Sequence, residues 1–156
     1  MSVFNPATKK QVDTGLAILR VVIGAIFVAH GGQKLFVFGL DGVAGAFGQM
    51  GIPMAGILGP FVAFVEFFGG LALVSGLLTR LASLGLLSTM VVAILKVHLP
   101  NGFFAPNGIE FPLALIGGTA LLALTGAGSL SIDSLIAKKT ARSESAPQVG
   151  RIRRAA

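Results

Sequence analysis

The chain has 156 residues, of which 54% are hydrophobic and only 12% are charged. Soluble domains carry about twice that charged fraction, and a chain this short leaves much of its surface uncovered. The composition therefore excludes an ordinary soluble domain and predicts an integral membrane protein. The lack of cysteine excludes disulfides, thiolate nucleophiles, iron–sulfur clusters and thiolate metal sites, and no metal site is predicted.

The N-terminal residues 1–15 are polar and do not have the pattern of a cleavable signal peptide, so they are predicted to be a short cytoplasmic segment. Four apolar runs follow. Because about 20 apolar residues cross the hydrocarbon core as a helix, each run is predicted to span the membrane. The sequence thus predicts an all-α fold, a bundle of four transmembrane helices within residues 16–136, with spans at about 16–38, 56–78, 81–99 and 111–130.

The connections between the runs differ in length. Residues 39–55 are rich in glycine and are predicted to form a short amphipathic or re-entrant segment. Residues 79–80 leave room only for a tight turn, which makes the second and third spans antiparallel. Residues 100–110 contain two Asn-Gly pairs and two prolines, which indicate a loop. Residues 137–156 form a basic tail that is predicted to be disordered and cytoplasmic.

The distribution of lysine and arginine predicts the orientation. The N-terminal segment, the 79–80 turn and the tail hold basic residues, whereas the loops 39–55 and 100–110 hold none. Because basic loops stay in the cytoplasm, both termini are predicted to be cytoplasmic. The net charge of +6 then lies at the membrane edge, where it can meet anionic lipid headgroups. No nucleic-acid partner is predicted, because no basic face carries base-stacking groups.

Ionisable groups within the bilayer are the candidates for function, because each costs several kcal/mol unless it is paired or hydrated. By helix rise, His30 and Glu66 lie roughly 21 and 18 Å from the cytoplasmic ends of their spans, nearly level with each other. The predicted site is a polar pocket in the outer half of the bundle, made of His30, Gln33, Lys34, Glu66, Lys96, His98 and Glu110. A structural interpretation stays open for the groups near the interface, which can extend to water. Arg20 is predicted to extend to the cytoplasmic lipid phosphates.

Four segments of the chain carry a resemblance to a known family. They are LRVVIGAIFVAHGGQKL (19–35), EFFGGLALVSGLLTRLA (66–82), LKVHLPNGFF (95–104) with NGIE (107–110), and GAGSLSID (126–133). In this order and spacing, residues 16–136 resemble the DoxX family of small bacterial membrane proteins. The resemblance implies a four-helix membrane protein of the bacterial inner membrane. It also implies a link to redox complexes, since related DoxD-type subunits belong to thiosulfate:quinone oxidoreductase.

Three main functions follow as alternatives, and a haem protein is a fourth, weaker one, because His30 and His98 are offset by roughly 6 Å in depth by helix rise. The first is a subunit of a quinone-linked oxidoreductase or respiratory complex, with a quinone as the candidate cofactor. In it His30 and Glu66 are the candidate catalytic groups, and the candidate binding groups are Gln33, Lys34, Lys96, His98 and Glu110. The second is a non-enzymatic membrane anchor with a soluble redox enzyme as its partner. The third is a carrier for a small solute or anion, bound by Lys34 and Lys96. A homo-oligomer is compatible with all three.

Overall fold

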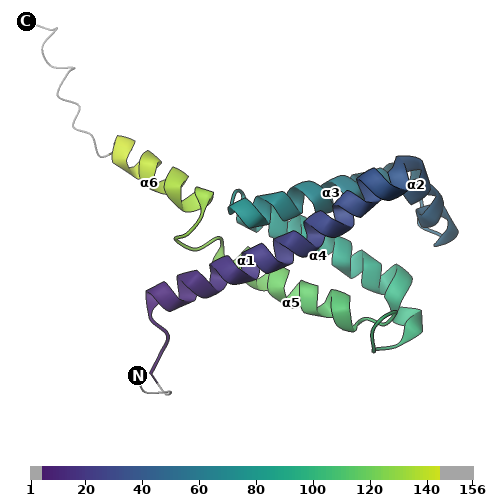
Figure 1. The fold of residues 1–156 in the computed structure, drawn as a ribbon, viewed down its shortest axis with the longest axis horizontal. Helices are drawn as coiled ribbons and strands as arrows, with labels where there is room; N and C mark the ends of the chain where they lie inside the picture. Colours follow the sequence, from purple (N-terminus) through teal and green to yellow (C-terminus); the bar gives the residue numbers. More distant parts are fainter. Residues whose placement is uncertain (1–4, 145–156) are drawn as a thin grey trace, which may run out of the picture.

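The computed structural model describes residues 5–144, and every regular element in this range is a helix (Figure 1). The helices are α1 (Lys9–Gly32), α2 (Gly39–Gln49), α3 (Ala55–Ser75), α4 (Thr79–Ala93), α5 (Glu110–Thr125) and α6 (Ile132–Glu144). Two π-helical segments, Gln33–Phe38 and Ile94–His98, extend α1 and α4, and a short 3-10 turn covers Leu99–Asn101. The predicted all-α class is confirmed.

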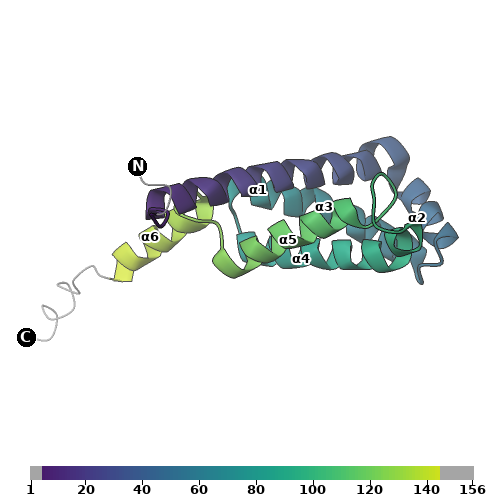
Figure 2. The same cartoon turned by 90° about the horizontal axis from the view of Figure 1, so that it is seen from below.

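The four long helices form two antiparallel pairs. α1 packs along α3, α4 packs along α5, and a short turn joins α3 to α4. The pairs lie together near the start of α1 and diverge toward α2, as Figure 1 shows, and Figure 2 gives the view from below. We call the two ends of the bundle the termini end, which holds the start of α1 and the α3–α4 turn, and the α2 end.

Glycines bring α1 and α3 close together. A Cβ on Gly24 would lie 2.7 Å from the carbonyl oxygen of Gly70, and a Cβ on Gly31 would collide with the backbone of Phe67. Any larger side chain would separate the helices, so these glycines set the contact, as small residues do in many pairs of membrane helices. Beside this contact lies the apolar core, made of Ile23, Phe27, Leu73, Leu86, Leu115 and Leu122.

Arg20 of α1 is buried at the termini end, with only 3% of its surface exposed. Its guanidinium donates hydrogen bonds to the carbonyl oxygens of Leu73 and Val74, at 3.2 and 3.1 Å, and to that of Leu130. Leu73 and Val74 lie in the last turn of α3, where helix carbonyls lack their usual partners and attract a positive charge. The prediction that Arg20 extends to the lipid phosphates is therefore wrong, because the protein itself supplies the acceptors.

The start of α6 is tied to the α3–α4 turn. The carboxylate of Asp133 accepts hydrogen bonds from the amides of Leu78 and Thr79, at 2.7 and 3.0 Å, and so caps the N-terminus of α4. The tail that was predicted to be disordered from residue 137 is helical over residues 137–144, where it forms the end of α6. The rest of that predicted tail, residues 145–156, lies outside the described residues.

Three helical stretches of the described chain are long and apolar enough to cross a membrane: Lys9–Gln49, Ala55–Ser75 and Thr79–Asn101. The shorter apolar helix α5 has 16 residues and ends where Gly126 takes a φ of 80°, so the predicted run to residue 130 is not helical throughout. Large apolar side chains such as Phe36 and Leu124 are 75% and 78% exposed, which suits contact with lipid. The predicted short segment 39–55 contains α2.

Candidate functional site

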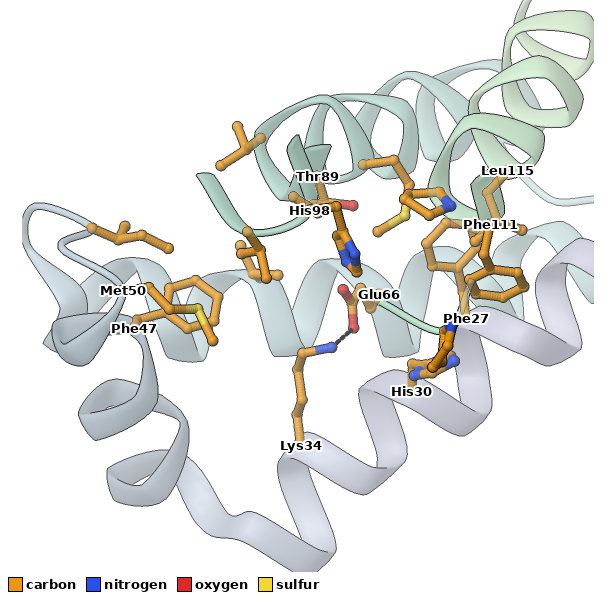
Figure 3. A pocket seen from close by; sticks show the side chains of 18 residues that line it. Phe27, His30, Lys34, Phe47, Met50, Glu66, Thr89, His98, Phe111 and Leu115 are labelled. Carbon is orange, nitrogen blue, oxygen red and sulfur yellow. Dashed lines mark hydrogen bonds and ion pairs between the residues drawn. The ribbon is translucent and has the colours of Figure 1, made fainter. Parts of the chain in front are cut away.

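A cavity of about 370 Å³ lies between the two helix pairs at the α2 end (Figure 3). Most of its lining is apolar and aromatic, with Phe27, Phe47, Met90, Phe111 and Leu115 among the contributors. Its polar lining residues are His30, Lys34, Glu66, Thr89 and His98. An apolar hollow with a few convergent polar groups is the usual form of a small-molecule site.

Lys34 and Glu66 form an ion pair in the middle of this cavity. The Lys34 Nζ lies 2.5 Å from Oε2 of Glu66, and Figure 3 shows the two side chains reaching toward each other from α1 and α3. Glu66 is 3% exposed, whereas the Lys34 side chain is 22% exposed. Because an unpaired charge in this apolar setting costs several kcal/mol, each group makes the burial of the other tolerable.

The sequence of α1 explains why Lys34 reaches the cavity. Phe27, His30 and Lys34 follow the i, i+3, i+7 spacing of one helix face, and all three line the cavity. Lys34 lies in the first π-helical segment, which ends at Gly39 with a φ of 70°. Such segments are rare and are frequent at functional sites. The second π-helical segment places His98 on the cavity from α4.

His98 is oriented by the loop that follows it. Its Nδ1 lies 2.8 Å from the carbonyl oxygen of Asn107. Because a carbonyl oxygen only accepts, Nδ1 carries the proton and donates it, which leaves Nε2 as the basic nitrogen of the neutral ring. In Figure 3 the ring of His98 points toward Glu66. His98 therefore offers a proton-accepting nitrogen beside the ion pair.

The structure brings together four of the predicted site residues and separates the other three from them. His30, Lys34, Glu66 and His98 line the cavity, whereas Gln33, Lys96 and Glu110 do not. Gln33 is exposed, since it lies roughly 90° around the helix from the centre of the cavity face. Lys96 is exposed because a residue two positions from His98 lies on the opposite side of the helix. The assignment of catalytic and binding roles remains a prediction.

Glu110 has a local structural role. It is the first residue of α5, and its carboxylate accepts a hydrogen bond from the amide of Ala105 at 2.9 Å. This bond closes the loop between α4 and α5, next to the contact of His98 with Asn107. The two bonds hold the loop over the α2 end, and Pro106 of the loop lines the cavity.

Several cavity residues were not predicted from the sequence. Thr89 of α4 is almost fully buried in the lining, and its hydroxyl donates to the carbonyl of Leu86 at 2.8 Å. The sequence gives no signal that singles out Thr89, because the same run also contains the hydroxyls of Ser83 and Ser88. Phe47 of α2 and Met50, which follows it, close one end of the cavity, and nothing in the sequence shows that α2 folds back to reach it.

The arrangement is suited to an apolar molecule with a few polar atoms. The Lys34 ammonium can donate hydrogen bonds, and the His98 ring and Glu66 can exchange protons. Within residues 5–144 no three His, Asp or Glu side chains are grouped in a way that could hold a metal ion.

The chain is similar to known proteins over most of its length. The DoxX family model matches residues 15–99. The chain is 36% identical to "Inner membrane protein YqjF" of Escherichia coli K12, over 84% of this chain and 98% of that protein. It is 33% identical to "Putative oxidoreductase CatD" of Bacillus subtilis 168, over 83% of this chain and 92% of that protein.

A third relative is "Uncharacterized membrane protein Rv3486" of Mycobacterium tuberculosis H37Rv, 31% identical over 78% of this chain and 80% of that protein. No solved structure matches the chain. The family match, the length over which the relatives align and the long apolar helices lead to one conclusion: the chain belongs to the DoxX family and is a multi-pass protein of the bacterial inner membrane.

Proposed function

We propose that the chain is a quinone-linked subunit of a membrane redox complex and that the cavity at the α2 end holds the quinone head group. The observation that carries this proposal is the Lys34–Glu66 ion pair, buried beside an apolar cavity that two histidines also line. A purely structural ion pair does not need a hollow next to it. The relative named "Putative oxidoreductase CatD" supports redox chemistry in the family.

The cavity suits a quinone in size and in chemistry. Its volume of about 370 Å³ lies within the range of roughly 300–1,000 Å³ for small-molecule sites. Phe27, Phe111 and Leu115 offer apolar contacts to a ring, and Lys34 offers a hydrogen bond to a ring carbonyl. Reduction of a quinone to a quinol takes up two electrons and two protons. We assign the proton exchange to Glu66 and to His30 or His98, and the electrons to a redox partner of the complex.

We further propose four membrane spans with both termini in the cytoplasm. α5, with 16 residues, is about 24 Å long by helix rise, a little short of a hydrocarbon core of about 30 Å. Its antiparallel packing against α4 supports a fourth span. Arg80 lies at the termini end together with α6, which carries Lys138 and Lys139, and this favours a cytoplasmic location for that end. The cavity then lies in the outer half of the membrane.

The test is the content of bound quinone. Wild type, Glu66→Gln and Asp41→Asn are purified in mild detergent, extracted with organic solvent, and the extracts are measured by absorption. Asp41 is an exposed carboxylate of α2 outside the cavity, so it is the matched control. We expect near-stoichiometric quinone in the wild type and the control, and about a tenfold loss in Glu66→Gln, equivalent to roughly 1.4 kcal/mol of binding free energy. A quinone-free wild type contradicts the proposal.

A second candidate function is a membrane anchor for a soluble redox enzyme. It is favoured by α6, which projects from the bundle in Figure 1 and exposes Lys138 and Lys139. Truncation after Ala137 should then release a co-purifying enzyme. The same truncation should leave quinone content unchanged, so the two functions are separable.

A further inference from the structure

We infer that the cavity opens sideways into the hydrocarbon layer between α1 and α5, with the rings of His30 and Phe111 as its gate. Its ligand is then an amphiphile dissolved in the membrane and does not arrive from water. This inference rests on the proposed function only in treating the cavity as the ligand site.

The first observation is the uneven packing of α1 against α5. Toward the termini end, Gly118 of α5 leaves space that the side chain of Ile23 fills, and Leu19 lies beside them. At the α2 end a ring pair lies between α1 and α5. The ring centroids of His30 and Phe111 are 6.2 Å apart, and the ring planes are tilted by 48°.

Both residues of this pair line the cavity and are exposed, Phe111 by 45%. The pair therefore lies at the rim of the cavity, between α1 and α5. Figure 3 shows His30 and Phe111 together with Phe27 and Leu115 at one end of the cavity, with the ion pair next to them. A molecule that passes between the two rings therefore arrives directly at Lys34 and Glu66.

The second observation concerns what lies outside this edge. His30 is roughly 21 Å from the start of the first apolar run by helix rise, which is inside a hydrocarbon core of about 30 Å. Toward the termini end, exposed residues on the two helices are apolar, such as Val22 on α1 and Leu113 on α5, whereas the exposed Gln33 and Glu110 lie on the α2 side. The edge therefore faces acyl chains on its termini side.

The third observation is that the route to water at the α2 end is covered. The loop after α4 lies over the cavity through Pro106, and hydrogen bonds from His98 to Asn107 and from Ala105 to Glu110 hold it there. On the side of the cavity away from the ring pair, the lining is apolar, with Phe47 and the 44% exposed Met50.

The test uses the absence of native cysteine, which makes a single introduced thiol the only reactive one. Thr89→Cys places a thiol of similar size in the cavity lining, and Met90→Cys, also in the lining, is the second choice if the first does not fold. Protein in liposomes is treated with a lipid-soluble maleimide, N-cyclohexylmaleimide, or with a membrane-impermeant sulfonated maleimide. The labelling rate is then measured in double variants, which combine the cysteine substitution with Phe111→Ala, His30→Ala, Met50→Ala or the control Leu113→Ala.

We expect the lipid-soluble reagent to label the thiol many times faster than the sulfonated one. Phe111→Ala and His30→Ala should raise the lipid-soluble rate several-fold, while Leu113→Ala, an exposed apolar residue of α5 outside the lining, leaves it unchanged. Any of three results would overturn the inference. They are faster labelling by the sulfonated reagent, a labelling rate that responds only to Met50→Ala, and no labelling by either reagent. The labelling reaction needs no quinone. A purified protein without quinone would therefore contradict the proposed function, whereas the labelling result would still test the lateral opening.

Discussion

The two ends of the bundle both bury charged side chains, but their surroundings differ. At the termini end, the Arg20 guanidinium is spread over three backbone carbonyls, and Asp133 caps two amides. At the α2 end, Lys34 and Glu66 have each other and face a cavity of about 370 Å³. Burial of a charge thus does not by itself mark function. A charge beside space for another molecule is the stronger sign.

The largest effect on stability is expected from Lys34→Met. It leaves the Glu66 carboxyl without its partner in an apolar setting, so the free energy of unfolding should fall by about 3–5 kcal/mol. The measurement is unfolding in mixed detergent micelles. The double variant Lys34→Met/Glu66→Gln should recover most of this loss, because no charge is then left unpaired, yet it should not retain quinone. Recovery of both stability and quinone would assign the pair a purely structural role.

Arg20→Gln should lower the free energy of unfolding by roughly 3 kcal/mol, because hydrogen bonds from a charged donor to several carbonyls are lost. At the termini end we expect stability to fall without loss of the ligand: Arg20→Gln protein that remains folded keeps its quinone. Arg80→Gln is the control, since exposed Arg80 makes one long hydrogen bond, 3.4 Å to the carbonyl of Leu124. Loss of quinone from folded Arg20→Gln protein would contradict the claim that the two ends of the bundle differ in function.

Asp133→Ala should cost about 1 kcal/mol, the usual effect of removing a helix N-cap. The variant removes the two side-chain hydrogen bonds between the α3–α4 turn and α6 and keeps the backbone bond from the Asp133 amide to the carbonyl of Gly76, so limited proteolysis should cut the chain faster near Ile132. Equal proteolysis rates in the variant and the wild type would mean that other contacts hold α6 in place.

The smallest effects are expected from Gln33→Leu and Lys96→Met, because both residues are exposed and lie outside the cavity lining. Their quinone content should stay within about twofold of the wild type, less than 0.5 kcal/mol of binding free energy. A tenfold loss in either variant would show that the functional site extends beyond the cavity.

The sequence predicts the all-helical class and membrane location, because both follow from apolar runs that need no knowledge of packing. It also identifies Glu66 as a group that needs a partner, because the cost of an intramembrane carboxylate is independent of the fold. It does not show that Arg20 meets the end of α3, since the acceptors are backbone carbonyls that any sequence has. Nor does it distinguish Lys34 from Gln33, or His98 from Lys96, because that depends on the direction in which the two π-helical segments present them.

The most direct test of the central claim, that the cavity at the α2 end binds a quinone, is a fluorescence titration. The chain has no Trp or Tyr, so Phe47→Trp, an aromatic replacement in the cavity lining, gives a single reporter without background. With decylubiquinone added to purified protein, we predict saturable quenching in this variant and its loss when Lys34→Met/Glu66→Gln is added. Quenching that does not saturate, or the same saturable quenching in both proteins, would contradict the account.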